Sequence, residues 1–162
     1  SKHGVKKVAV LDTDAHCGGG TFQLVGDNER VVLADVSCNS YDIWRPNSDR
    51  HYLEIVRSAS EYLDAVQRAL DHLEGVDVLI YNAGMDPFED CSTGGMSGIT
   101  RDLLEERERL VAQWCEDTQT PAMFVLAGGY GGKNLDLDGV ARLHLPTIRE
   151  FARIRINPKS KN

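Results

Sequence analysis

The fold is decided by the stretch Leu11-Asp12-Thr13-Asp14-Ala15-His16-Cys17-Gly18-Gly19-Gly20-Thr21, which continues directly from the apolar residues 8–11. In extended backbone alternate side chains point the same way, so Asp12, Asp14 and His16 are expected on one side of a strand end. Carboxylate oxygens and an imidazole nitrogen are donors that suit a divalent metal. The stretch therefore predicts a buried strand that ends in a metal site.

Strands and helices alternate along the rest of the chain. Short, apolar, β-branched runs predict strands buried on both faces at residues 5–11, 30–37, 76–81 and 122–126. Apolar residues spaced three and four apart predict helices at 48–74 and 101–115, and Pro146 near a first turn adds 146–154. This order predicts an α/β fold, a three-layer parallel β-sheet flanked by helices, in a single domain over residues 1–162.

Ligands of parallel sheets bind beyond the carboxyl ends of the strands, and polar or glycine-rich segments follow each predicted strand. A catalytic zinc site has three protein ligands and one open position for water. Asp14, His16 and Asp90 are expected to be the three ligands. Two carboxylates make the site hard enough to suit Fe²⁺ or Mn²⁺ as well. Tyr130, on a glycine loop, can donate a hydrogen bond to a developing oxyanion.

Three motifs occur in a fixed order along the chain. They are Asp12-Thr13-Asp14-Ala15-His16 with its glycine turn, Ala83-Gly84-Met85-Asp86 followed by Asp90 and Gly94-Gly95, and Gly128-Gly129-Tyr130. Together they resemble the zinc-dependent deacetylase branch of the arginase/deacetylase superfamily. That branch includes histone deacetylases, acetoin-utilisation deacetylases and acetylpolyamine amidohydrolases.

The resemblance implies a role for each matching residue. Asp14, His16 and Asp90 resemble the metal ligands, and Tyr130 resembles the tyrosine that stabilises the transition state. Asp12 and Ser37 resemble contributors to a structural K⁺ site. Asp86 resembles a residue that supports the ligands from behind.

The chain also departs from the family pattern. The family's tandem histidines lie upstream of the first matching strand, and no two of the five histidines here are adjacent. Cys17 stands in place of a second histidine, and Gly19 in place of an Asp or Asn. The chain thus resembles only the C-terminal half of a deacetylase domain. We expect weak or no hydrolysis of acetyl-lysine or acetylated amines by this half alone.

Partners and location follow from the same features. A half-sheet leaves an edge or a face exposed, which predicts a homo-oligomer or a complementing chain. A net charge of −7 argues against nucleic acid and anionic membranes, and the absence of a 20-residue apolar run argues against a membrane span. Four cysteines without metal-site or disulfide spacing predict free thiols in the cytoplasm.

Two other functions fit parts of the sequence. The first is a non-catalytic α/β module that kept the half-fold and binds a metal, a small ligand or a partner. The second is a dinucleotide-binding enzyme, because residues 77–84 resemble the Asn-Ala-Gly strand of short-chain dehydrogenases. A glycine fingerprint is absent after the first strand, however, and the carboxylates there would repel a pyrophosphate.

Overall fold

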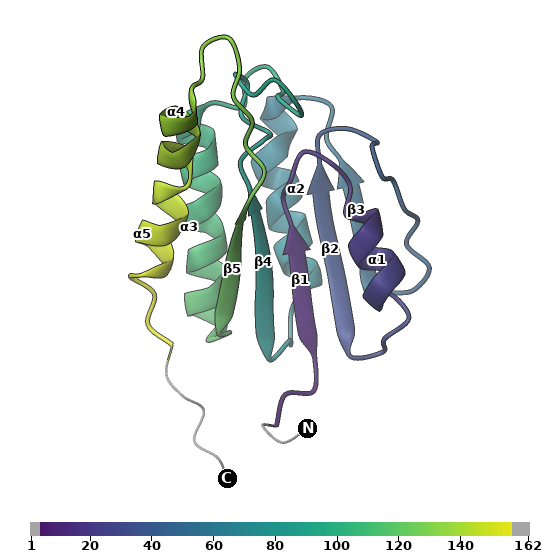
Figure 1. Ribbon diagram of the computed structural model, residues 1–162. Helices are drawn as coiled ribbons and strands as arrows, with labels where there is room; N and C mark the ends of the chain where they lie inside the picture. Colours follow the sequence, from purple (N-terminus) through teal and green to yellow (C-terminus); the bar gives the residue numbers. More distant parts are fainter. Residues whose placement is uncertain (1–3, 157–162) are drawn as a thin grey trace.

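The computed structural model describes residues 4–156, which build one sheet of five parallel strands (Figure 1). The strands are β1 (Val8–Asp12), β2 (Val31–Ser37), β3 (His51–Ile55), β4 (Val78–Gly84) and β5 (Ala122–Ala127). Their order across the sheet is β3-β2-β1-β4-β5. The α/β class and the parallel sheet predicted from the sequence are confirmed.

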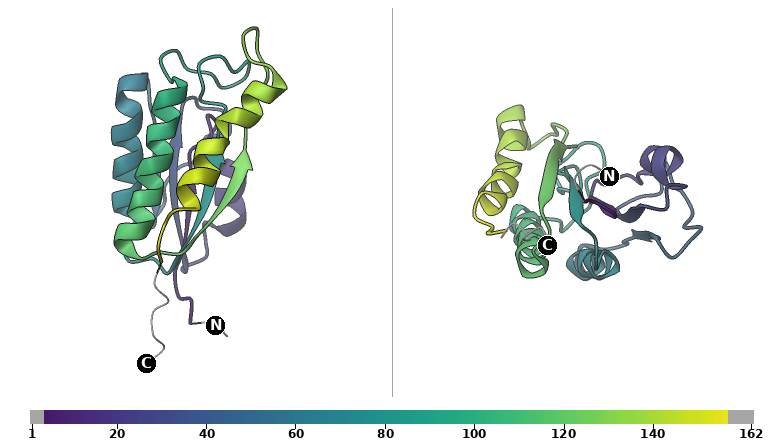
Figure 2. Two further views of the ribbon diagram at one scale, coloured as in Figure 1. Left: turned by 90° about the vertical axis from the view of Figure 1, so that its left-hand side faces the viewer. Right: turned by 90° about the horizontal axis from the view of Figure 1, so that it is seen from below.

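Helices cover both faces of this sheet, as the end-on view in Figure 2 shows. The helices are α1 (Gly19–Val25), α2 (Ala59–His72), α3 (Arg101–Thr118), α4 (Leu137–Leu143) and α5 (Leu145–Phe151). The two long helices, α2 and α3, lie on one face with α5 packed beside α3, and α1 lies on the other face (Figures 1 and 2).

The main core lies between the sheet and the two long helices. Leu11 and Leu79 of the strands are fully buried there with Val66 of α2 and Val111 of α3. This is the apolar burial that the helix spacing predicts. Within residues 4–156, no helix is both long and apolar enough to cross a membrane.

The helix predicted over residues 48–74 is wrong in its first part. Residues His51–Ile55 form the edge strand β3, and the helix begins only at Ala59. The helical spacing of apolar residues begins only at Val56. The residues of β3 show neither this spacing nor a clear alternation of buried and exposed side chains, so the sequence carries no strong signal for a strand. Pairing of β3 with β2 decides the local structure, since Leu33 faces His51 in the parallel register.

Two further differences concern short helices. The predicted helix at 146–154 is α5, which begins earlier and is preceded by the unpredicted α4. The unpredicted α1 begins within the glycine turn. A β-carbon at Gly19 would lie 2.4 Å from the Asp42 carbonyl oxygen, so the turn passes too close to that loop for any larger residue.

His51 is buried at the start of β3, on the α1 side of the sheet. Its Nε2 lies 3.0 Å from the Gly26 carbonyl oxygen, and its Nδ1 lies 3.2 Å from Ser48 Oγ. Phe22 and Trp44 pack edge-to-face against the ring. Burial lowers the pKa of His51, so the folded protein holds the neutral imidazole.

This environment predicts a pH-dependent stability. The ordinary histidine pKa is 6.5, and below this pH the unfolded chain takes up a proton that folded His51 does not. The free energy of unfolding therefore decreases as the pH is lowered below 6.5. His51→Gln should reduce this slope by at most about 1.4 kcal/mol per pH unit, the limit for one group. Urea denaturation at several pH values measures the slope, and equal slopes for both proteins would contradict the prediction.

Candidate metal centre

The pairing of β1 with β4 brings two distant parts of the sequence to one place. The parallel register runs from Val8 opposite Val78 to Asp12 opposite Asn82, so both strands end at the same edge of the sheet. Asp14 follows the end of β1, and Asp86 follows the end of β4. Residues that follow these two strands are therefore neighbours in space.

Asp14, His16 and Asp86 form the one group in the described part of the chain whose ligand atoms could hold a metal ion. These atoms all lie within 4.8 Å of one another. His16 Nδ1 is 3.0 Å from Asp14 Oδ1 and 3.0 Å from Asp86 Oδ2. The side chains of Asp14 and His16 are about one-fifth exposed, so the group opens to solvent on one side.

Asp86 gives this group its strongest preference for a cation. Its Oδ1 accepts the Ala15 N–H at 3.1 Å, whereas its buried Oδ2 accepts no hydrogen bond. Burial, and secondly the charge of Asp14, raise the pKa of Asp86 to about 7. Because Oδ2 makes no hydrogen bond and lies 3.0 Å from His16 Nδ1, a divalent cation between these atoms would bind both and offset the repulsion between the carboxylates, so the residues present fit a metal.

Glycines let the surrounding backbone close around the carboxylates. A β-carbon at Gly128 would lie 2.5 Å from Asp86 Oδ1 and 2.9 Å from Asp14 Oδ2. Gly128 also has a φ of 60°, a left-handed conformation that favours glycine. The loop that carries Tyr130 therefore begins against the metal group, and the Tyr130 side chain is 45% exposed.

The structure does not bring Asp90, the third ligand expected from the sequence, into the metal group. Asp86 takes the place beside Asp14 and His16. Asp90 is half-buried, and its backbone carbonyl lies against Gly132. Asp86 meets Asp14 and His16 because it lies nearer than Asp90 to the end of β4, where the ladder with β1 holds the chain in position.

Asp12 and Ser37 lie behind the group and do not join it. Asp12 Oδ1 accepts the Asp14 N–H at 3.0 Å and Asn82 Nδ2 at 2.8 Å. Burial, and secondly the charge of Asp35, raise the pKa of Asp12 to about 7. Ser37 is buried and donates its hydroxyl hydrogen to Asp35 Oδ1 at 2.5 Å. Their role in binding K⁺ stays a prediction.

Asp35 is a buried acid that the sequence reasoning missed. Its Oδ2 accepts the Gly18 N–H at 2.7 Å and Trp44 Nε1 at 2.8 Å, so it ties the glycine turn to the sheet. The one signal for it was an acidic residue inside the otherwise apolar run of β2. Burial raises the pKa of Asp35. Its bond to Gly18, together with that of Asp42 to Gly20, occupies amides of the turn that a phosphate would need.

Arg107 and Glu108 were missed as well. Both side chains are fully buried in α3, and Arg107 Nη2 lies 2.6 Å from Glu108 Oε1. They occupy the buried stripe that Leu104 and Val111 define. Two charges within an apolar helical stripe were the available signal.

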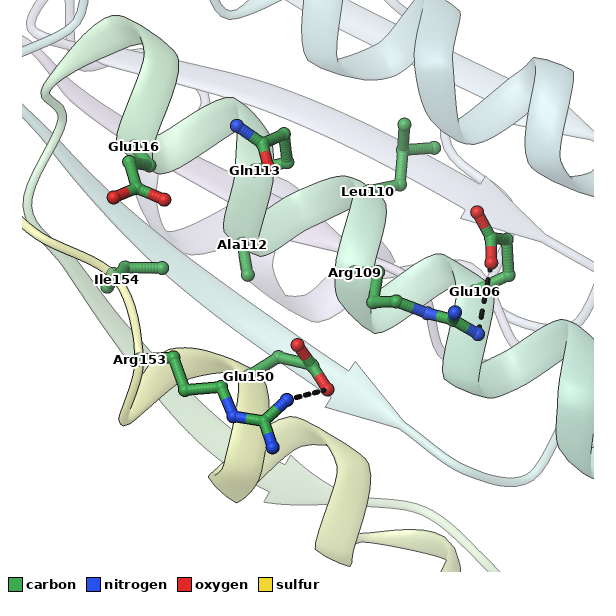
Figure 3. Close-up of a pocket in the computed structure, with 9 residues that line it drawn as sticks. All are labelled: Glu106, Arg109, Leu110, Ala112, Gln113, Glu116, Glu150, Arg153 and Ile154. Carbon is green, nitrogen blue, oxygen red and sulfur yellow. Dashed lines mark hydrogen bonds and ion pairs between the residues drawn. The ribbon is translucent and has the colours of Figure 1, made fainter.

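The protein surface also has a groove away from the metal group. It has a volume of about 380 Å³ and lies between α3 and the C-terminal end of α5 (Figure 3). Ion pairs within each wall, Arg109 with Glu106 and Arg153 with Glu150, use much of its charge. The groove shares no lining residue with the metal group, so it is not part of this centre.

Comparison with known sequences decides the family. The sequence profile described as the histone deacetylase domain matches residues 1–142. The chain belongs to the histone deacetylase domain family. Histone deacetylase 2 of Arabidopsis thaliana is 26% identical over 134 residues, which are 78% of this chain and 34% of that protein. An uncharacterised protein of Picosynechococcus is 28% identical over 141 residues, 82% of this chain and 45% of its own.

Solved structures share the fold of this deacetylase domain. An acetylpolyamine aminohydrolase from Burkholderia pseudomallei matches 95% of this chain and 47% of its own, with a TM-score of 0.74 and 20% identity. A histone deacetylase homologue from Aquifex aeolicus matches 99% of this chain and 50% of its own, with a TM-score of 0.63 and 14% identity. The chain thus spans half or less of the length of these relatives.

The geometry predicts which aspartate binds the metal. Asp86→Asn removes one charged ligand and keeps the side-chain volume. Because loss of a residue that merely supports a ligand weakens metal affinity by about 10–100-fold, we expect at least this loss of Zn²⁺ affinity. Asp90→Asn is the matched control and should bind Zn²⁺ like the unmodified chain. Competition with a chromophoric chelator measures both affinities, and the opposite ranking would return the ligand role to Asp90.

Proposed function

We propose that this chain is the metal-binding half of a zinc-dependent deacetylase that hydrolyses acetyl amides. The observation that carries the proposal is the group of Asp14, His16 and Asp86 at the carboxyl edge of the sheet, in a chain of the histone deacetylase family. The named relatives suggest acetyl-lysine and acetylated polyamines as the substrate class. Fe²⁺ and Mn²⁺ suit the same two carboxylates and imidazole, and K⁺ near Asp12 and Ser37 is a second proposed cation.

Each residue of the centre has a task in this proposal. Asp14, His16 and Asp86 hold the metal, which when bound acts as a Lewis acid toward the amide carbonyl. Asp12 orients Asp14 through its backbone N–H. Tyr130 donates a hydrogen bond from its hydroxyl to the oxygen that gains negative charge in the transition state, and the glycine loop gives it room to approach.

The proton transfers need a further base. Of the histidines in the described part of the chain, only His16 belongs to the metal group. His144 lies against the neighbouring glycine turn, with its Nε2 3.8 Å from the position of a β-carbon at Gly129, and it is not part of the group. A positioned general base contributes about 10²–10⁴-fold to the rate. We therefore propose that residues 1–162 alone are a weak catalyst and that a segment outside them supplies the base. A cytoplasmic location remains part of the proposal, in keeping with four free thiols.

The activity prediction separates this proposal from the non-catalytic alternative. With Zn²⁺, the chain should release acetate slowly from an acetyl-lysine peptide or an acetylated polyamine, roughly 10²–10⁴-fold below the rate with a base in place. Asp14→Ala should abolish the release, and Tyr130→Phe should lower it by about 10²-fold or more. Zinc-loaded chain that releases no more acetate than Asp14→Ala would favour a binding module.

A bare face of the sheet supports a docking position for the proposed second segment. The sheet face that carries α1 has no described helix over β4 and β5, and this bare face is in front in Figure 1. Ile80 pairs with Met123 in the parallel register, so their side chains share this face with Val125. Met123 is 55% exposed and Val125 is 47% exposed. Parallel sheets are covered on both faces, and β5 is also an unpaired edge, so we propose that the segment covers this face and edge.

The same face predicts self-association of the chain when the segment is absent. We expect residues 1–162 to form oligomers at micromolar concentration, and Val125→Lys to shift them toward monomers because a charge on the face opposes burial. Leu24→Lys is the matched control, since Leu24 is an 86% exposed leucine on α1. Sedimentation velocity measures both variants. Monomers of the unmodified chain, or equal effects of both substitutions, would contradict the docking face.

A further inference from the structure

We infer that Arg107 is a positioning residue for the metal centre. Its buried guanidinium joins the two strand ends that carry Asp14 and Asp86, which are 72 positions apart in the sequence. The inference deepens the proposed function and rests on it, because the residues it positions are the proposed metal ligands. The inference gives a functional role to Arg107, a buried charged residue that is not itself a member of the metal group.

The hydrogen bonds of one nitrogen carry the argument. Arg107 Nη1 donates to the Gly84 carbonyl at 2.7 Å and approaches the Thr13 carbonyl at 3.3 Å. Thr13 directly precedes the ligand Asp14, and Gly84 stands two positions before Asp86. A single guanidinium therefore sets the separation of the two ligand-bearing segments.

The guanidinium acts where the backbone ladder ends. The last register pair of β1 and β4 is Asp12 with Asn82, followed by a bond from the Thr13 N–H to the Asn82 carbonyl at 3.2 Å. Buried carbonyls need a donor, and Arg107 supplies it at the point where the strands diverge. The Ala15 N–H to Asp86 Oδ1 bond, at 3.1 Å, then links the two segments inside the metal centre.

Close packing transmits the position of Gly84 to the ligands. A β-carbon at Gly84 would lie 2.5 Å from Asp14 Cα, so the end of β4 is in direct contact with the backbone of a ligand. A shift of the Gly84 carbonyl toward or away from Arg107 therefore moves Asp14 relative to Asp86. Protein interiors are too densely packed to absorb such a shift locally.

Stability alone does not explain a buried ion pair at this point. Arg107 Nε donates to Glu108 Oε1 at 2.7 Å, and Tyr81 donates to the same oxygen at 2.9 Å. Burying two charges costs desolvation free energy that apolar replacements avoid, so such pairs are often no more stable than a hydrophobic contact. The planar fork of arginine offers what apolar residues and lysine lack, several donors in fixed directions.

Arg107→Lys tests the inference, because lysine keeps a charge beside Glu108 and loses the fork. The first measurement is hydrogen exchange of the Ala15 amide in metal-free protein. We expect exchange about tenfold faster at Ala15 and unchanged at Val66, a fully buried residue of α2. The second measurement is Zn²⁺ affinity, which should fall about 10–100-fold, as for other residues that hold metal ligands in place.

Two further variants keep the outcome decisive. Arg109→Lys, on the same helix and half exposed, is the matched control and should change neither readout. If Arg107→Lys does not fold, Tyr62→Phe removes the hydroxyl that accepts from Arg107 Nη1 at 2.9 Å and approaches the same Thr13 carbonyl at 3.4 Å, and it should accelerate Ala15 exchange to a smaller extent.

The outcomes separate the two proposals. A folded Arg107→Lys variant with Ala15 exchange and Zn²⁺ affinity equal to those of the unmodified chain would overturn the positioning role. An unmodified chain that binds no Zn²⁺ would overturn the proposed function instead. In that case the exchange rate of Ala15 still decides whether Arg107 holds the two strand ends together.

Discussion

The parallel pairing of β1 with β4 is the constraint on which the rest of the structure depends. It sets Asp12 opposite Asn82, and so it places the segments that follow the two strands side by side. Local sequence cannot achieve this, because the strands are separated by two other strands and two helices along the chain. Everything at the metal centre, from the ligand group to the Gly128 loop, is built on this register.

The centre concentrates negative charge in a buried place. Burial raises the pKa values of Asp12 and Asp86 to about 7, and it also raises that of Asp35. Backbone amides and the Trp44 indole satisfy several of these oxygens, but Asp86 Oδ2 accepts no hydrogen bond. The arrangement is thus poised for a cation, and the neighbouring Arg107 is already neutralised by Glu108.

Much of the fold was predictable because apolar periodicity is a local property. Four of the five strands and the helix α3 follow from it to within a few residues, and α2 follows from it except at its start, which was placed too early. The strand β3 was not predictable in this way, since its five residues form a strand by pairing with β2 at the sheet edge. The division of the C-terminal segment into α4 and α5 was missed for the same reason, because packing against α3 is a tertiary effect.

By itself, the sequence determined the fold class, the family motifs and two members of the metal group, Asp14 and His16, because these depend on spacing within short segments. Only the tertiary structure decided that Asp86 and not Asp90 completes the group. It also decided that Arg107 lies between the strand ends. The physical reason is common to both: which side chains meet depends on strand register and close packing between distant segments, and neither is encoded in the spacing of any one of them.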